Sequence, residues 1–127
     1  MPLKIKEYAM NIEELRDYCL SLKGATEEFP FDEFSLVLKV KGKMFGLIPL
    51  NNPETQISLK CDHERAIALR EEFTAIVPAW HFNKKHWNTV MIDPTISRVF
   101  LFELINHSYN LVVAGLPKAL KAELDAV

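Results

Sequence analysis

Two short apolar segments joined at a glycine constrain the fold of this chain more than any other feature. Residues 35–40 and 44–49 both have the composition of strands, and Gly42 supplies the positive φ that a two-residue hairpin turn needs. Such a turn would place one set of apolar side chains on a single face of the hairpin: Leu36, Leu38, Val40, Phe45 and Leu47. A three-residue loop would reverse this assignment. Either way, the sequence predicts a β-hairpin with one buried face.

Helical periodicity marks three further segments. Asn11 is followed three residues later by Glu14, which predicts a capping box, and Gly24 ends the apolar stripe that follows. Asp62 is placed to cap a second helix. The longest helix is expected from about 97 to 114, before a glycine that stops it.

Three more stretches are typical of strands. Residues 56–61 alternate between polar and apolar, residues 75–78 form a brief apolar run, and residues 89–92 follow the polar and aromatic cluster 80–88 as a buried strand. Residues 25–34 are expected to be an acidic connection. Three helices with several neighbouring short strands indicate an α+β fold, in which a mostly antiparallel sheet has its helices packed on one face.

Length and composition fit one domain. The chain has 127 residues, of which 49% are hydrophobic and 25% charged, so we expect a single domain over 1–127, with 1–10 as an N-terminal extension and 118–127 as a polar tail. Cys19 and Cys61 lie on apolar-patterned segments and do not indicate a disulfide framework. The first residues contain no long apolar run, so neither a secretory signal nor a membrane partner is expected. These features predict a cytoplasmic protein.

Residue spacing gives little support for a metal site or for catalysis. His81 and His86 lie five residues apart, and Cys61 and His63 have no second pair of ligands nearby. The chain contains no nucleophile elbow, no P-loop and no glycine-rich dinucleotide turn. The sequence therefore predicts no catalytic residue, no cofactor and no metal, and it favours a function other than catalysis.

A first functional hypothesis is DNA binding through two basic edges. The net charge of −2 gives no overall attraction to nucleic acid, so binding would require local basic patches. The candidate phosphate-binding residues lie near the hairpin tip and in the 80–88 cluster: Lys39, Lys41, Lys43, Lys84, Lys85 and His86. So few positive contacts predict weak binding that depends steeply on salt.

A second hypothesis places a small molecule or a protein partner at the 80–88 cluster. Two amides and two imidazoles there offer directional hydrogen bonds rather than bulk charge. The residues of this candidate ligand site are His81, Asn83, His86, Trp87 and Asn88. Both hypotheses require the polar groups of residues 83–88 to point outward from a rigid edge of the sheet.

Four segments together resemble the MmcQ/YjbR family. They are Glu-Phe-Pro-Phe-Asp at 28–32, Lys-Met-Phe at 43–45, Asn-Lys-Lys-His-Trp-Asn-Thr-Val at 83–90, and His-Ser-Tyr followed by Leu-Val-Val within 107–113. The resemblance covers nearly the whole chain, from about Asn11 to Lys118. It implies a small bacterial protein with a frataxin-like (CyaY-like) α+β fold, described as a double wing, for which DNA binding has been proposed. It implies no established enzymatic activity.

The likeness to frataxin adds a third hypothesis by fold analogy alone, cation binding by acidic residues at Glu13, Glu14, Asp17, Glu27 and Glu28. One position departs from the family pattern. Ala79 stands where the family usually has a glycine, so a positive φ there would require a different turn.

Overall fold

A six-stranded antiparallel sheet and four helices make up residues 10–127, which are the residues that the computed structural model describes. The strand order is β1-β2-β3-β4-β6-β5. The strands are β1 (Ala25–Glu28), β2 (Ser35–Val40), β3 (Lys43–Pro49), β4 (Gln56–Lys60), β5 (Ile76–Pro78) and β6 (Trp87–Met91). The helices are α2 (Ile12–Ser21), α3 (His63–Glu72), α4 (Arg98–Ala114) and α5 (Lys118–Asp125). The predicted N-terminal extension, except for Met10, lies outside the described residues.

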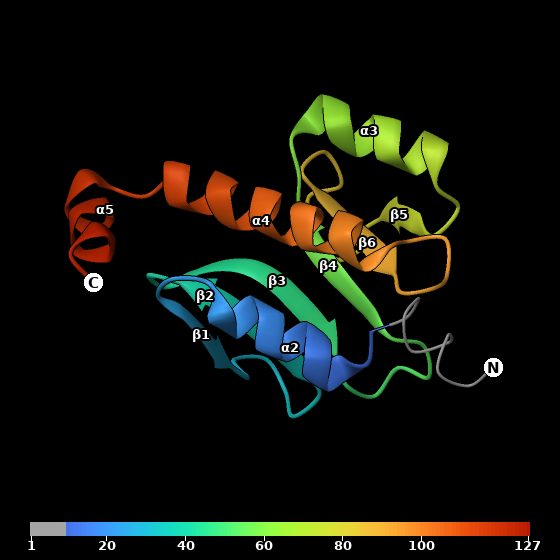
Figure 1. The fold of residues 1–127 in the computed structure, drawn as a ribbon, viewed down its shortest axis with the longest axis horizontal. Helices are drawn as coiled ribbons and strands as arrows, with labels where there is room; N and C mark the ends of the chain where they lie inside the picture. The colour runs from blue at the N-terminus through green and yellow to red at the C-terminus, as the bar shows by residue number, and fades with distance from the viewer. Residues whose placement is uncertain (1–9) are drawn as a thin grey trace.

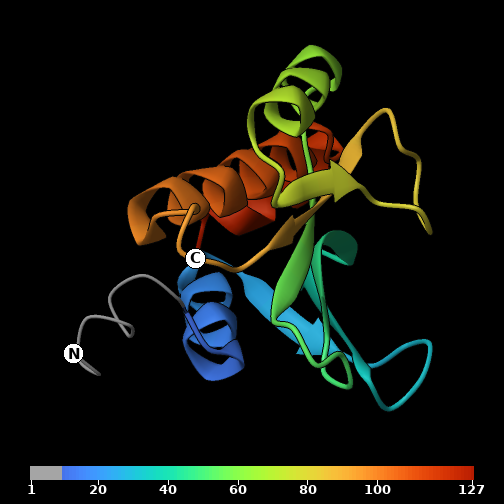
Figure 2. The same ribbon diagram turned by 90° about the vertical axis from the view of Figure 1, so that its right-hand side faces the viewer.

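The helices cover one face of the sheet and leave the other face open. Figure 2 shows α2 and α4 on one side of the sheet, whereas the connections 29–34 and 79–86 project from the other side. Helix α4 packs along β3 and β4, and α3 packs against β5 and β6 (Figure 1). The core lies between these layers and includes Leu15, Cys19, Leu38, Phe45, Ile57, Val90, Leu101 and Ile105. The α+β class, the antiparallel sheet and the one-sided packing of the helices are confirmed.

The helices begin where local sequence signals place their caps. Asn11 Oδ1 accepts a hydrogen bond from Glu14 N at 2.8 Å, and Glu14 Oε1 accepts one from Asn11 N at 3.3 Å, so the predicted capping box is confirmed. Asp62 caps α3 and Ser97 caps α4 in the same way, through a side-chain oxygen that accepts a backbone N–H. Within residues 10–127, no helix combines the length and the apolar composition needed to cross a membrane.

Two segments have more structure than the sequence predicted. The predicted connection 25–34 begins with strand β1, which pairs with β2 at the edge of the sheet. The predicted polar tail contains helix α5, whose Leu124 is buried. In Figure 1, α5 lies beyond the end of α4, near the tip of the β2–β3 hairpin. Both elements are short, with four residues in β1 and eight in α5, and so few positions give periodicity little to indicate.

The β2–β3 hairpin has the predicted turn but a different register. Lys41 and Gly42 have φ values of 48° and 78°, as a two-residue hairpin turn requires. Beyond the turn, Lys39 pairs with Met44, whereas Leu38 pairs with Gly46. Phe45 is therefore the extra residue of a β-bulge, and alternation along β3 is reversed after it.

This bulge corrects the predicted orientation of Leu47. Leu36, Leu38, Val40 and Phe45 lie in the core as predicted, but the reversed alternation places Ile48 there instead of Leu47. Leu47 points to the open face of the sheet, where it lines a groove. The single extra residue in β3 thus decides which side chains form the open face.

Candidate functional site

A groove of about 870 Å³ lies on the open face of the sheet. Its floor is a row of four side chains that pair across β3, β4, β6 and β5: Leu47, Ser58, Thr89 and Val77. Because successive side chains of a strand alternate between faces, these residues point away from the helices, whereas Ile57 beside them points into the core. A second row extends the floor with Ser35, Pro49, Gln56 and Met91.

Three connections between strands form the walls of the groove. Phe31 and Asp32 come from the β1–β2 connection, residues 51–53 from the β3–β4 connection, and residues 79–82 from the β5–β6 connection. Figure 2 shows the first and last of these on the same side of the sheet. Phe31 and Trp80 are 67% and 65% exposed. Large exposed aromatic side chains that border a groove are typical of a binding surface.

A pair of hydroxyl groups lies on the floor of the groove. Ser58 Oγ and Thr89 Oγ1 are 2.8 Å apart, and the two residues are only 5% and 9% exposed. Each hydroxyl has one hydrogen and two lone pairs, and their mutual hydrogen bond uses only one of the two hydrogens. The pair can therefore both donate and accept a further hydrogen bond.

The groove carries little charge. Asp32 and His81 are the only titratable residues among the described residues that line it. The Asp32 carboxylate accepts hydrogen bonds from Phe34 N, Ser35 N and Ser35 Oγ at 2.8, 2.7 and 3.2 Å, and the two backbone bonds lower the pKa of this carboxyl. Asp32 thus orders its own connection, and the described residues that line the groove include no lysine or arginine.

Aromatic contacts support the wall formed by the β5–β6 connection. The ring of Phe82 stacks on that of Trp87, with centroids 5.0 Å apart. The Lys84 ammonium lies 4.5 Å from the centroid of the Trp80 ring. Ala79 does not have a positive φ, since Lys41 is the only non-glycine residue within 10–127 that does. The alanine in place of the family's glycine is therefore accommodated without strain.

Comparison with known proteins identifies the family. The family model described as YjbR matches residues 20–111. The chain belongs to the YjbR family. It is 31% identical to the uncharacterized protein YjbR of Escherichia coli K12 over 109 residues. This alignment covers 86% of this chain and 92% of that protein. It is 39% identical to the uncharacterized protein YbdF of Escherichia coli O157:H7 over 90 residues. This second alignment covers 71% of this chain and 74% of that protein.

Solved structures share the YjbR fold of this chain. The crystal structure of Deinococcus radiodurans protein DR2400 superposes with a TM-score of 0.86 at 38% identity, covering 95% of this chain and 91% of that one. A crystal structure of a Pseudomonas syringae protein superposes with a TM-score of 0.70 at 26% identity. The superposition covers 80% of this chain and 98% of that one. The resemblance to the family is confirmed, and the finer likeness to CyaY and frataxin stays a prediction.

The five residues of the predicted ligand site do not converge in this YjbR-family domain. His81 lines the groove, but Asn83 and His86 are exposed on the turn beyond it, and Trp87 stacks behind its wall. Asn83 Oδ1 accepts a hydrogen bond from Lys85 N at 3.0 Å and so closes its own turn.

Asn88 points away from the other four residues. It alternates with Thr89 along β6, so its side chain lies on the helix side of the sheet, where it is 2% exposed. Its Nδ2 donates a hydrogen bond to Ala66 O of α3 at 3.2 Å. Asn88 is placed to hold α3 against β6, and the outward orientation that the sequence suggested applies to residues 83–86 only.

The predicted DNA-binding residues form two separate groups. Lys39 forms an ion pair with Glu28, and Lys41 Nζ lies 3.8 Å from Glu123. The hairpin tip that carries them lies near α5, whereas the His86 ring lies 6.1 Å from that of His63 at the start of α3. Within residues 10–127, no ion pair involves Lys43, Lys84, Lys85 or His86.

Most of the acidic residues named in the cation-binding hypothesis form ion pairs with neighbouring basic side chains. Within residues 10–127, no group of three or more His, Cys, Asp or Glu side chains is arranged to hold a metal ion. Three of the five carboxylates form ion pairs: Glu14 with Arg98, Glu27 with Arg16 and Glu28 with Lys39. Their geometry gives this hypothesis no support.

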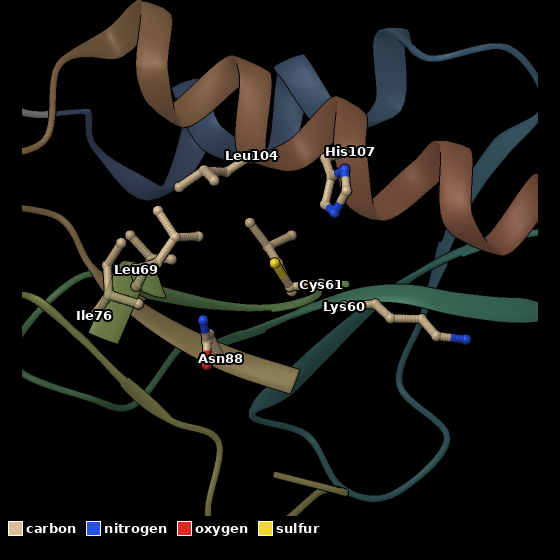
Figure 3. A pocket seen from close by; sticks show the side chains of 9 residues that line it. Lys60, Cys61, Leu69, Ile76, Asn88, Leu104 and His107 are labelled. Atoms are coloured by element: carbon tan, nitrogen blue, oxygen red, sulfur yellow. The ribbon is translucent and has the colours of Figure 1, made fainter. Parts of the chain in front are cut away.

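A second, much smaller cavity lies between the sheet and α4. Figure 3 shows Cys61, Asn88 and His107 around it. Its volume of about 10 Å³ leaves room for no more than a water molecule. Burial raises the pKa of the Cys61 thiol, and it raises that of the core residue Cys19 to about 12. Neither cysteine is therefore an activated nucleophile.

The imidazole of His107 makes the stability of this fold depend on pH. Its Nε2 accepts a hydrogen bond from Asp62 N at 3.2 Å, and burial lowers its pKa below the ordinary value of 6.5. As the pH falls below 6.5, the unfolded chain binds a proton at this residue before the folded chain does, so stability decreases until the lowered pKa is passed. Urea unfolding between pH 7.5 and 5 should show this loss in wild type and a smaller loss in His107→Gln. Parallel curves for the two proteins would contradict it.

Proposed function

We propose that this YjbR-family domain binds a small, uncharged molecule in the groove on the open face of the sheet. The observation that carries the proposal is a groove of about 870 Å³ with exposed aromatic walls and a buried pair of hydroxyl groups on its floor. Ligand sites of this size are typically mostly apolar, with a few placed polar groups that orient the ligand. This is the second sequence hypothesis, moved from the 80–88 cluster to the open face.

The charge of the lining supports an uncharged ligand. The Asp32 carboxylate already accepts hydrogen bonds from its own connection, and the remaining polar groups of the lining are hydroxyls, amides and one imidazole. Among the described residues of the lining, a phosphate or carboxylate buried here would find no ammonium or guanidinium partner, which would make its desolvation costly. A neutral molecule avoids this cost.

A thermal-shift screen of neutral compounds tests the proposal. A ligand that binds only the folded chain raises the melting temperature by several degrees at concentrations well above its Kd. We expect such a shift to be the same at low and high salt, because no ion pair forms. We also expect Phe31→Ala/Trp80→Ala to abolish the shift, since both exposed walls of the groove are lost.

The matched control for that screen is Phe29→Ala. Phe29 is exposed on the same connection as Phe31 but does not line the groove. The control should keep the full shift. A ligand whose effect is equal in the wall variant and in the control does not bind in the groove, and a screen with no groove-dependent ligand would refute the proposed function.

DNA binding is a second candidate, supported by a different observation. Lys84, Lys85 and His86 form an exposed turn beside the exposed ring of Trp80. Basic groups next to an exposed aromatic ring suit contacts with the nucleic-acid backbone and its bases. Such binding would use the outer surface of the β5–β6 connection and not the groove.

A duplex-DNA titration at several salt concentrations tests this second candidate. If Lys84 and Lys85 each contact a phosphate, Lys84→Glu/Lys85→Glu should reduce the slope of log affinity against log salt by about 2. The matched control Lys118→Glu/Lys121→Glu changes the net charge equally but lies on α5. Equal loss of affinity in both variants would show that only net charge matters, and this site would be ruled out.

A further inference from the structure

The proposed groove gathers side-chain amides at one end. Gln56 belongs to the second floor row, and Asn51 and Asn52 lie in the adjacent β3–β4 connection. Asn52 Oδ1 accepts a hydrogen bond from Glu54 N at 3.2 Å. Within residues 10–127, the side-chain amide groups of Asn51 and Gln56 make no hydrogen bond. Each therefore has a donor and an acceptor side by side for a ligand.

The aromatic wall on the other side presents a flat surface. The Lys84 ammonium lies over one face of the Trp80 ring, and Lys84 does not line the groove. Trp80 itself lines the groove and is 65% exposed, so part of its ring surface is available to a ligand. Flat rings pack on such a surface by offset stacking, which orients them as well as binding them.

We propose that the ligand of the groove is a flat, uncharged heteroaromatic ring with donors and acceptors on its edge, of the kind found in nucleosides. The ring would stack on Trp80, while Gln56 and the hydroxyl pair of Ser58 and Thr89 bind its edge. Side-chain amides pair in a bidentate manner with the edges of such rings. This inference rests on the proposed function and specifies the class of its ligand. The lining selects the nucleoside over the nucleotide, because none of the described residues that line the groove is a lysine or an arginine that could hold a phosphate.

Calorimetric titration of the full chain tests the inference with three sets of probes. The first set is adenosine, guanosine, cytidine and uridine, the second is their 5′-monophosphates, and the third is methyl glucoside as an uncharged ring without a flat face. We expect at least one nucleoside to bind, its monophosphate to bind no more tightly at low salt, and the glucoside not to bind.

Two variants and two controls locate the contacts. Trp80→Ala should weaken nucleoside binding by about tenfold or more, as the loss of a stacking partner does. Gln56→Leu should weaken it and change the order of preference among the four bases. Phe29→Ala and Asn110→Leu replace an exposed aromatic ring and an exposed amide outside the groove, so binding should be unchanged.

The outcomes separate this inference from the proposed function. No nucleoside binding at millimolar concentration, equal binding of the glucoside, or tighter and salt-dependent binding of a monophosphate would each overturn the inference. Other neutral compounds that bind in the groove would still leave the proposed function standing. A concentration-dependent dimer that Trp80→Ala dissociates would show that a second copy of the chain fills the groove, and both proposals would be wrong.

Discussion

Replacing Phe45 with alanine is expected to lower the free energy of unfolding by about 3–5 kcal/mol. Phe45 is a large, fully buried side chain, and its ring meets that of Tyr109 edge-on with centroids 5.5 Å apart. Its carbonyl also accepts a hydrogen bond from Ser108 Oγ at 2.6 Å. Because Phe45 is the extra residue of the bulge, it anchors β3 to α4 at the point where the strand changes face.

The matched control is Phe31→Ala, the same chemical change at an exposed position. It should change the free energy of unfolding by no more than about 0.5 kcal/mol. Urea unfolding followed by tryptophan fluorescence and by circular dichroism measures both variants. Similar losses of stability in the two variants would mean that Phe45 is not the core anchor of the hairpin.

Replacing Gly24 with alanine is expected to cost about 2–4 kcal/mol of stability, from two separate causes. Gly24 has a φ of 73°, which disfavours any residue with a Cβ. An added Cβ would also lie 2.6 Å from Leu124 Cδ1 of α5, so this buried side chain would have to move. The effect therefore reports on the packing of α5 against the turn that follows α2.

Gly42→Ala separates these two causes. Gly42 has a similar φ of 78°, but an added Cβ there would meet no atom within 4 Å. We expect this variant to lose only about 1–2 kcal/mol, the cost of the left-handed conformation. If chemical denaturation shows equal losses for the two glycines, α5 does not pack on Gly24 as described.

Most of the fold could be predicted because its signals are local. The cap at Asn11, the turn at Gly42 and the stop at Gly115 each depend on neighbouring residues, and all three are where the sequence placed them. The bulge at Phe45 could not be predicted in this way. It results from the packing of Phe45 and Gly46 on the same face, which depends on β4 and α4.

The candidate site was harder to predict because it depends on which face each strand residue takes. The 80–88 cluster offered polar groups, but the sheet turns Asn88 inward, and His81 is the only one of the five predicted ligand-site residues that lines the groove. The alternation of residues 56–61 already places Ser58 between two apolar residues, as is typical of the second face of a strand. Thr89 follows the polar Asn88, so alternation gives no such signal in β6, and its pairing with Ser58 is seen only in the fold.

The most direct test of the central claim is a two-dimensional amide NMR titration with a ligand found by the neutral-compound screen. If the groove binds it, the largest shift changes should fall on the floor residues Leu47, Ser58, Val77 and Thr89, which come from four different strands. Changes confined to residues 83–86, or to α3 and α4 on the opposite face, would contradict the account.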